Sequence, residues 1–100
     1  MDITLASAQD QAEAVRTGAI SAVELLDATV DRYERFNPVI NAIVVERIDD
    51  ARLRAADADA AMAAGESWGR LHGVPMTIKE AWAWMGTPST SGHRHLVEWR

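Results

Sequence analysis

The feature that most constrains the fold of this chain is a wide apolar stripe that begins just after Ser21. Ser21 and Glu24 have the spacing of a capping box, which marks the start of an α-helix. The residues that follow repeat at intervals of three and four along one helix face: Ala22, Leu25, Leu26, Thr29, Val30, Tyr33 and Phe36. Asn37-Pro38 should end the helix, because the residue before a proline disfavours helical backbone angles. The sequence therefore predicts a helix over residues 21–36 that needs a partner surface, since an isolated helix of this length is marginal.

Two further helices are predicted, one on each side of this stripe. Ser7 is placed to cap a short helix over residues 8–17, which ends at Gly18. A longer helix is expected over residues 47–64, where alanines favour helix formation but bury little surface each. Gly65 ends this helix. The expected role of the helix is to cover one face of a sheet.

Two short segments have the pattern of β-strands. Residues 40–45 form an apolar, β-branched run that suits a strand covered on both faces. In residues 74–80, apolar side chains alternate onto one face and leave Lys79 on the other. The predicted fold class is therefore α/β, with about three helices and two strands.

Composition excludes several classes of protein. The chain has 100 residues, of which 48% are hydrophobic and 25% charged, enough for one small domain. A formal net charge of −5 argues against a nucleic-acid partner or an anionic membrane surface. The lack of cysteine excludes disulfides and thiolate metal sites, and no run approaches the roughly 18 apolar residues that a membrane helix needs. With no signal-like start either, we expect a cytoplasmic location.

Lys79 is the side chain in these two segments that is best suited to catalysis. It would leave its strand near the carboxyl end, where ligands collect in open α/β sheets. A lysine desolvated there can serve as a base or a nucleophile. The alternative is that Lys79 guards an edge strand or reaches solvent, as most strand lysines do.

Longer motifs extend this interpretation. The run LHGVPMTIKEA at residues 71–81 is followed by GTPSTSG at residues 86–92. Together they strongly resemble the amidase signature family, whose members carry a GVP-x-x-x-K strand and then a G-x-P-T-T-x-G loop. Residues 18–25 and 37–42 are similar to that family's amino-terminal helices and first strand. The resemblance covers about residues 5–92.

This resemblance implies both a fold and a chemistry. Residues 1–100 would form the amino-terminal part of a single amidase-like domain with a larger mixed sheet. Lys79 would be the lysine of a serine, cis-serine, lysine triad that hydrolyses carboxamide C–N bonds, without a metal or an organic cofactor. The substrate would be a small-molecule amide. A loop containing Ser89, Thr90, Ser91 and Gly92 would line the site.

The two serines of such a triad have no match in this sequence. In the family they lie well beyond the lysine, in a segment resembling GGSSGGS, and the sequence reaches Arg100 before any such segment. The serines present are interpreted as helix caps, a turn residue and members of the lining loop: Ser7, Ser21, Ser67, Ser89 and Ser91. A dyad rebuilt from Lys79 and a loop serine is the weaker alternative. The isolated chain is therefore expected to be inactive toward amides.

The last residues depart from the family pattern. Ala83 stands where relatives have an acidic residue, and Gly92-His93 replaces the usual Gly-Ser. Residues 95–100 match no pattern that we recognise. A truncation or a frameshift would leave such a break, so we expect a fragment of a longer protein.

The histidines near the end raise the question of a metal site. His93 and His95 would share a strand face and, with His72 or Glu98, offer ligands to a divalent ion. Nothing in the sequence supplies the remaining ligands or their supporting hydrogen bonds. Solvated loop histidines are the favoured interpretation, and no metal is predicted.

A non-catalytic function is the alternative to an amidase. The helices expected over 21–36 and 47–64 would then pair with another polypeptide or with a second copy, because little chain is left to cover their apolar faces. The expected partners are accordingly a homo-oligomer or a complementing chain that supplies the serines. Light scattering discriminates these possibilities from a compact monomer.

Overall fold

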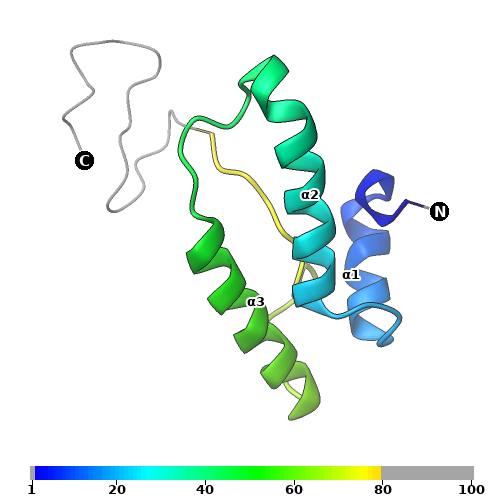
Figure 1. Ribbon diagram of the computed structural model, residues 1–100. Coiled ribbons are helices and arrows are strands. Elements are labelled where there is room, and N and C mark those ends of the chain that lie inside the picture. Colours follow the sequence, from blue (N-terminus) through cyan, green and yellow to red (C-terminus); the bar gives the residue numbers. More distant parts are fainter. Residues whose placement is uncertain (1, 80–100) are drawn as a thin grey trace.

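The computed structural model describes residues 2–79, and within that range the chain is helical. A short 3-10 helix, η1 (Ile3–Leu5), precedes three α-helices: α1 (Ala8–Arg16), α2 (Ala22–Ile40) and α3 (Ile48–Ala63). Figure 1 shows α2 running antiparallel to both α1 and α3. The expected α/β architecture is not seen in this part of the chain, because residues 2–79 contain no strand.

Side chains cap the start of α1, which occupies nearly the residues predicted for it. The Ser7 hydroxyl accepts a hydrogen bond from the Asp10 backbone N–H at 3.1 Å. The Gln11 side chain donates to the Ile3 carbonyl at 2.9 Å and ties η1 to the helix. Gly18 follows the helix with φ +79°, a left-handed conformation that favours glycine.

The start of α2 is held by two groups of side chains. The predicted capping box is confirmed: Ser21 Oγ accepts from the Glu24 backbone N–H at 3.0 Å, and Glu24 Oε1 accepts from the Ser21 N–H at 3.2 Å. The Asp59 carboxylate of α3 accepts from the backbone N–H groups of Ala22 and Val23 at 2.7 and 3.1 Å. The free N–H groups in the first turn of α2 therefore all have acceptors. One of these acceptors, the Asp59 carboxylate, also holds α3 beside the start of α2.

The predicted end of α2 at residue 36 is wrong, because the helix continues through Pro38 to Ile40. A proline lacks the N–H that a helix needs and its ring crowds the carbonyl four residues earlier, so Pro38 would be expected to break a helix interior. Here Pro38 lies in the last turn of α2, which continues for only two residues beyond it. The Asn41 N–H still closes the last turn on the Asn37 carbonyl at 2.7 Å. Asn41 itself is left-handed, with φ 48°, and ends the helix where asparagine is tolerated.

The strand predicted over 40–45 is absent, and a side chain takes the place of a partner strand. The Asn37 amide accepts from the Ile43 N–H at 2.9 Å and donates to the Ile43 carbonyl at 3.1 Å. These two hydrogen bonds occupy backbone groups that a neighbouring strand would otherwise use. Ile40 and Val44 are exposed, so the expected cover on both faces is not provided by residues 2–79.

The core lies between α2 and α3 and is built from small residues on the α3 side. It comprises Ala22, Leu26, Val30, Ala55 and Ala58, with Val23, Ile48 and Ala51 partly buried against it. Alanine side chains are small, so they let α2 and α3 approach closely. This explains how the alanine-rich α3 can have a packed face. Phe36 belongs to the predicted stripe but is exposed, and the guanidinium groups of Arg32 and Arg35 lie over its ring.

After α3 the chain turns at Gly65 and returns across the helices. Residues 74–79 are extended but form no strand, since no second strand lies beside them within the described range. Figure 1 shows this segment leaving the region where α1 and α2 meet and running toward the far end of α2. The predicted strand over 74–80 is thus an unpaired extended segment as far as Lys79, and residue 80 lies outside the described residues.

Candidate active site

Lys79 stands at the end of this extended segment and is exposed. It is the only lysine in the sequence. The residues expected around it, Ser89, Thr90, Ser91 and Gly92, lie outside the described residues. The structure therefore places the candidate base at the end of the described residues.

His72, which directly precedes the GVP motif, is the buried polar side chain of this region, with 6% of its surface exposed. Its Nδ1 accepts a hydrogen bond from the Trp68 backbone N–H at 2.9 Å. Its Nε2 lies 2.8 Å from the Ala58 carbonyl oxygen in α3. Because a backbone N–H can only donate, the neutral ring carries its proton on Nε2 and donates it to Ala58. Both ring nitrogens are thus occupied, and neither is available to a metal or to a serine hydroxyl.

Gly73 combines a left-handed backbone with close packing. Its φ is +80°, a conformation that side chains rarely adopt. A Cβ atom built at this position would lie 2.9 Å from Val15 Cγ1 and 3.2 Å from Ala22 Cβ. The glycine of the GVP motif is therefore required both by its backbone angle and by the close approach of α1 and α2.

The Trp68 ring packs against the His72 ring. The two ring centroids are 4.9 Å apart and the planes are tilted by 48°. The Arg54 guanidinium of α3 lies 4.0 Å above the Trp68 ring, a cation–π distance. Together with the His72 hydrogen bond to Ala58, this stack fastens the 68–73 turn to α3.

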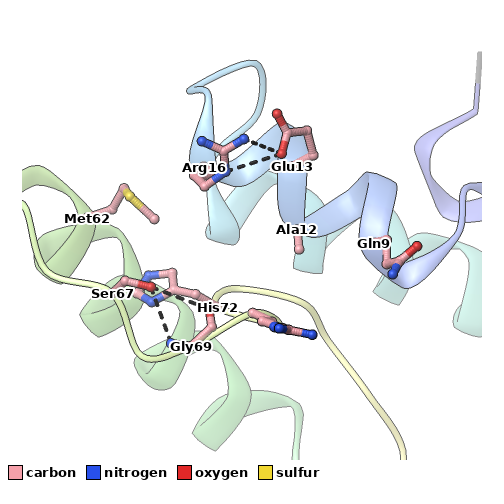
Figure 2. Close-up of a pocket in the computed structure, with 9 residues that line it drawn as sticks. Gln9, Ala12, Glu13, Arg16, Met62, Ser67, Gly69 and His72 are labelled. Carbon is pink, nitrogen blue, oxygen red and sulfur yellow. Dashed lines mark hydrogen bonds and ion pairs between the residues drawn. The ribbon is translucent and has the colours of Figure 1, made fainter.

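An open groove of about 540 Å³ lies beside His72, between α1 and this turn (Figure 2). Its walls come from α1, from the end of α3 and from the turn: Gln9, Ala12, Glu13, Arg16, Met62, Ser67, Gly69, Arg70 and His72. Glu13 and Arg16 form an ion pair, and a hydrogen bond to Glu13 raises the pKa of Arg16. Ser67 Oγ accepts from the Gly69 N–H at 3.2 Å and so serves a turn, as expected. The groove does not include Lys79 and holds no activated nucleophile.

A second polar pair lies at the far end of α2. The Tyr33 hydroxyl donates a hydrogen bond to the Glu46 carboxylate, in an open groove that also includes Asn37 and Asn41. This hydrogen bond, with burial and the Glu46 charge, raises the pKa of Tyr33 above 10.0. No sequence pattern indicated this pair, because it joins a helix to the following loop.

Neither a metal site nor a membrane helix is found among residues 2–79. No three His, Asp or Glu side chains in that range gather as ligands for an ion. His93, His95 and Glu98 lie outside the described residues. None of the helices described has both the length and the apolar character needed to cross a membrane.

Comparison with known proteins gives one consistent result. The sequence model of the Amidase family matches residues 24–100, a range that includes Lys79. The chain is 48% identical over 86 residues to an indoleacetamide hydrolase from Bradyrhizobium diazoefficiens. This alignment covers 86% of the chain and 16% of the relative. It is 37% identical over 92 residues to an acylamidase from Rhodococcus erythropolis, covering 92% of the chain and 19% of the relative.

A vertebrate protein shows the same similarity. The chain is 39% identical over 93 residues to fatty-acid amide hydrolase 2-B from Danio rerio. This alignment covers 86% of the chain and 18% of the relative. The chain therefore spans a fifth or less of the length of these relatives.

Proposed function

The chain belongs to the amidase family, and we propose that its residues form the amino-terminal part of a hydrolase that cleaves carboxamide C–N bonds, with Lys79 as the base. The observation that carries this proposal is the location of Lys79 in the GVP-x-x-x-K segment, six residues beyond the packed Gly73. The family match includes this segment, and relatives named as amide hydrolases align across most of the chain.

The proposed chemistry is acyl transfer through a serine, cis-serine, lysine triad. The neutral Lys79 amine takes a proton from a bridging serine, which takes one from the serine that attacks the amide carbonyl. The proton returns from Lys79 through the bridging serine to the leaving nitrogen, and the C–N bond breaks as the neutral amine or ammonia leaves. Water then hydrolyses the acyl-enzyme to the acid and restores the serine. Residues 2–79 leave Lys79 exposed, so the desolvation that favours a neutral amine must come from other residues.

Two further roles follow from this proposal. The loop of Ser89, Thr90, Ser91 and Gly92 lines the substrate site. The attacking and bridging serines are not among the serines of this sequence, so a polypeptide of these 100 residues is inactive toward amides. A chain that supplies those serines in trans would restore activity.

The inactivity is tested with the 100-residue polypeptide itself. We expect no release of amine from a simple aryl amide above the rate of a Lys79→Ala variant. Turnover that depends on Lys79 would show that the chain carries its own nucleophile, and would overturn this part of the proposal.

The role of Lys79 is tested in a longer enzyme. This sequence replaces the matching segment of the Bradyrhizobium indoleacetamide hydrolase, to which it is 48% identical. We expect the chimera to hydrolyse indoleacetamide, and Lys79→Met to lower kcat by about 10²-fold or more, as loss of a general base does. Arg35→Met, which removes an exposed cation of α2, is the matched control and should stay within about twofold.

Two results would contradict the role of Lys79. One is a folded chimera, shown by circular dichroism, that has no activity. The other is a Lys79→Met chimera that retains the activity of its parent.

One observation favours a second function, that of a self-associating helical module. Val39 and Ile40 at the end of α2 are 85% and 65% exposed. Apolar side chains so exposed on neighbouring residues are a common feature of association surfaces. The oligomeric state of the 100-residue polypeptide tests this alternative.

A further inference from the structure

His72 joins two parts of the structure, the turn at residues 68–73 and α3, through a single side chain. Its Nδ1 closes the turn that begins at Trp68, and its Nε2–H fastens that turn to the Ala58 carbonyl of α3. The ring is buried at 6% exposure and packs against Trp68. A buried imidazole with both nitrogens satisfied has one tautomer and one orientation.

The turn that His72 fastens leads directly to Lys79. The Val74 N–H donates to the Leu71 carbonyl at 3.0 Å, and Gly73 is seated against Val15 and Ala22. The position and direction in which the chain leaves Gly73 are therefore fixed on one side by α3, through His72, and on the other by α1 and α2.

We propose that His72 is a positioning residue, which sets the direction of the extended segment 74–79 and so the location of the Lys79 amine. Six extended residues reach about 20 Å. A change of direction of about 10° at Gly73 would move Lys79 by about 3 Å, and displacements of about 1 Å in a reacting group can cost 10²-fold in rate. The catalytic value of this anchor rests on the function proposed above for Lys79.

Two variants of His72 separate the effect of its hydrogen bond to Ala58 from the effect of its hydrogen bond to Trp68. In His72→Asn, the shorter side chain can accept from the Trp68 N–H but cannot reach Ala58. In His72→Gln, the side-chain amide nitrogen can occupy the place of Nε2 and donate to Ala58. The proposal therefore requires that Gln preserves the direction of the segment and that Asn does not.

The direct test uses the single lysine of the 100-residue polypeptide. Labelling with ¹⁵N-lysine gives one backbone amide resonance, that of Lys79. We expect His72→Asn to shift this resonance and to lower its heteronuclear NOE, whereas His72→Gln stays close to the parent. Val30→Ala, which weakens the α2–α3 core, is the control for a general loss of stability and should leave the resonance in place.

Labelling with ¹⁵N-histidine measures the tautomer directly, and the ring signals lost in His72→Gln are assigned to His72 among the three histidines of the sequence. The ring of His72 should show a protonated Nε2 and an unprotonated, hydrogen-bonded Nδ1. The opposite tautomer, or a Lys79 resonance that responds equally to His72→Asn and Val30→Ala at matched thermal stability, would overturn the proposal.

The chimeric enzyme separates failure of this anchor from failure of the proposed function. We expect His72→Asn to lower kcat about tenfold or more with KM within about twofold, and His72→Gln to recover most of the loss. A chimera that needs Lys79 but is unaffected by His72→Asn would refute the anchor and keep the function. A folded chimera that is inactive with both residues intact would refute the function, while the resonance experiment would still decide the anchor.

Discussion

Gly73 lies where backbone angle and packing both act against any side chain. Val15 and Ala22, which face it, are 2% and 0% exposed and have little room to move. We expect Gly73→Ala to lower the free energy of unfolding by about 1–3 kcal/mol for its left-handed backbone and by about 1–3 kcal/mol more for the contact with Val15. Chemical denaturation followed by circular dichroism measures the total.

Gly65 provides a matched control for this substitution. Its φ is +79°, nearly that of Gly73, but a Cβ atom there would meet nothing within 4 Å. Gly65→Ala should therefore cost only the backbone part, about 1–3 kcal/mol. Equal losses at the two glycines would show that the approach of α1 and α2 to Gly73 is not tight in solution.

Tyr33 is the only tyrosine, so its ionisation can be followed alone by tyrosinate absorbance. Its hydrogen bond to Glu46 holds the pKa of the phenol above the ordinary value of 10.0. In Glu46→Gln the negative charge is lost, and we expect the midpoint of this titration to fall toward 10.0. Asp31→Asn removes an exposed carboxylate of the same helix and should leave the midpoint unchanged.

The sign of the linked stability follows from the raised pKa. The folded state binds the phenolic proton more tightly than the unfolded state, so the contribution is complete below pH 10 and is lost as pH rises through the raised value. A midpoint in the parent chain at or below that of Glu46→Gln would show that Tyr33 and Glu46 do not pair.

At the scale of elements, the start of α2 depends on a residue 37 positions away. Asp59 accepts from the N–H groups of Ala22 and Val23, and its charge also favours the positive end of the helix dipole. We expect Asp59→Ala to cost about 1–2 kcal/mol of unfolding free energy, the usual loss for a helix cap. Asp57→Ala, at an exposed position on the same helix, is the control and should stay within about 0.5 kcal/mol. Equal effects of the two variants would mean that Asp59 does not cap α2.

Helix starts could be predicted because their signals are local. Ser7 and Ser21 each cap a helix within three residues, and both helices begin next to their predicted first residues. The end of α2 could not be predicted in the same way, because Pro38 is accommodated in the last turn and the helix ends at the left-handed Asn41 instead. Strands depend on partners elsewhere in the chain, so the apolar runs at 40–45 and 74–80 predicted a sheet that residues 2–79 do not form.

The candidate site shows the same division between local and distant signals. The spacing from Gly73 to Lys79 is readable in the sequence, and it identified the candidate base. The anchor that holds this segment was not predictable, because His72 bonds to a backbone carbonyl 14 residues away and a carbonyl carries no sequence signature. The sequence favoured solvated loop histidines, which is wrong for His72 because its ring is buried. The alternative role of metal ligand is also excluded for His72, because hydrogen bonds occupy both of its ring nitrogens.

For the molecule as a whole, the three helices and the GVP turn meet at one junction, formed by Val15, Ala22, Ala58, Asp59, His72 and Gly73. Asp59 and Ala58 are adjacent in α3, and one fixes α2 while the other holds His72. The packing of the helices and the direction of the Lys79 segment are therefore coupled. A variant that breaks this junction should also displace the segment that carries the candidate base, whereas Val30→Ala, which lies in the core outside the junction, should not.

The far end of α2 has no such cover among the described residues. Val39 and Ile40 are 85% and 65% exposed, and burying an apolar side chain of this size is worth about 1.5–3 kcal/mol. We expect the 100-residue polypeptide to self-associate through this end, with a weight-average mass that rises with concentration in sedimentation equilibrium. Replacing both residues by asparagine should weaken this association about tenfold or more, since 1.4 kcal/mol corresponds to a factor of ten.

Leu53 on α3 supplies the control for this last experiment. It is 69% exposed, and Leu53→Asn removes a similar apolar area from a different surface. If association is non-specific hydrophobic aggregation, substitutions at Val39, Ile40 and Leu53 will weaken it to a similar degree. If it is specific to the end of α2, the Leu53 variant will associate like the parent chain. A polypeptide that is monomeric at every concentration would exclude the self-associating module and leave the amidase proposal as the function of these residues.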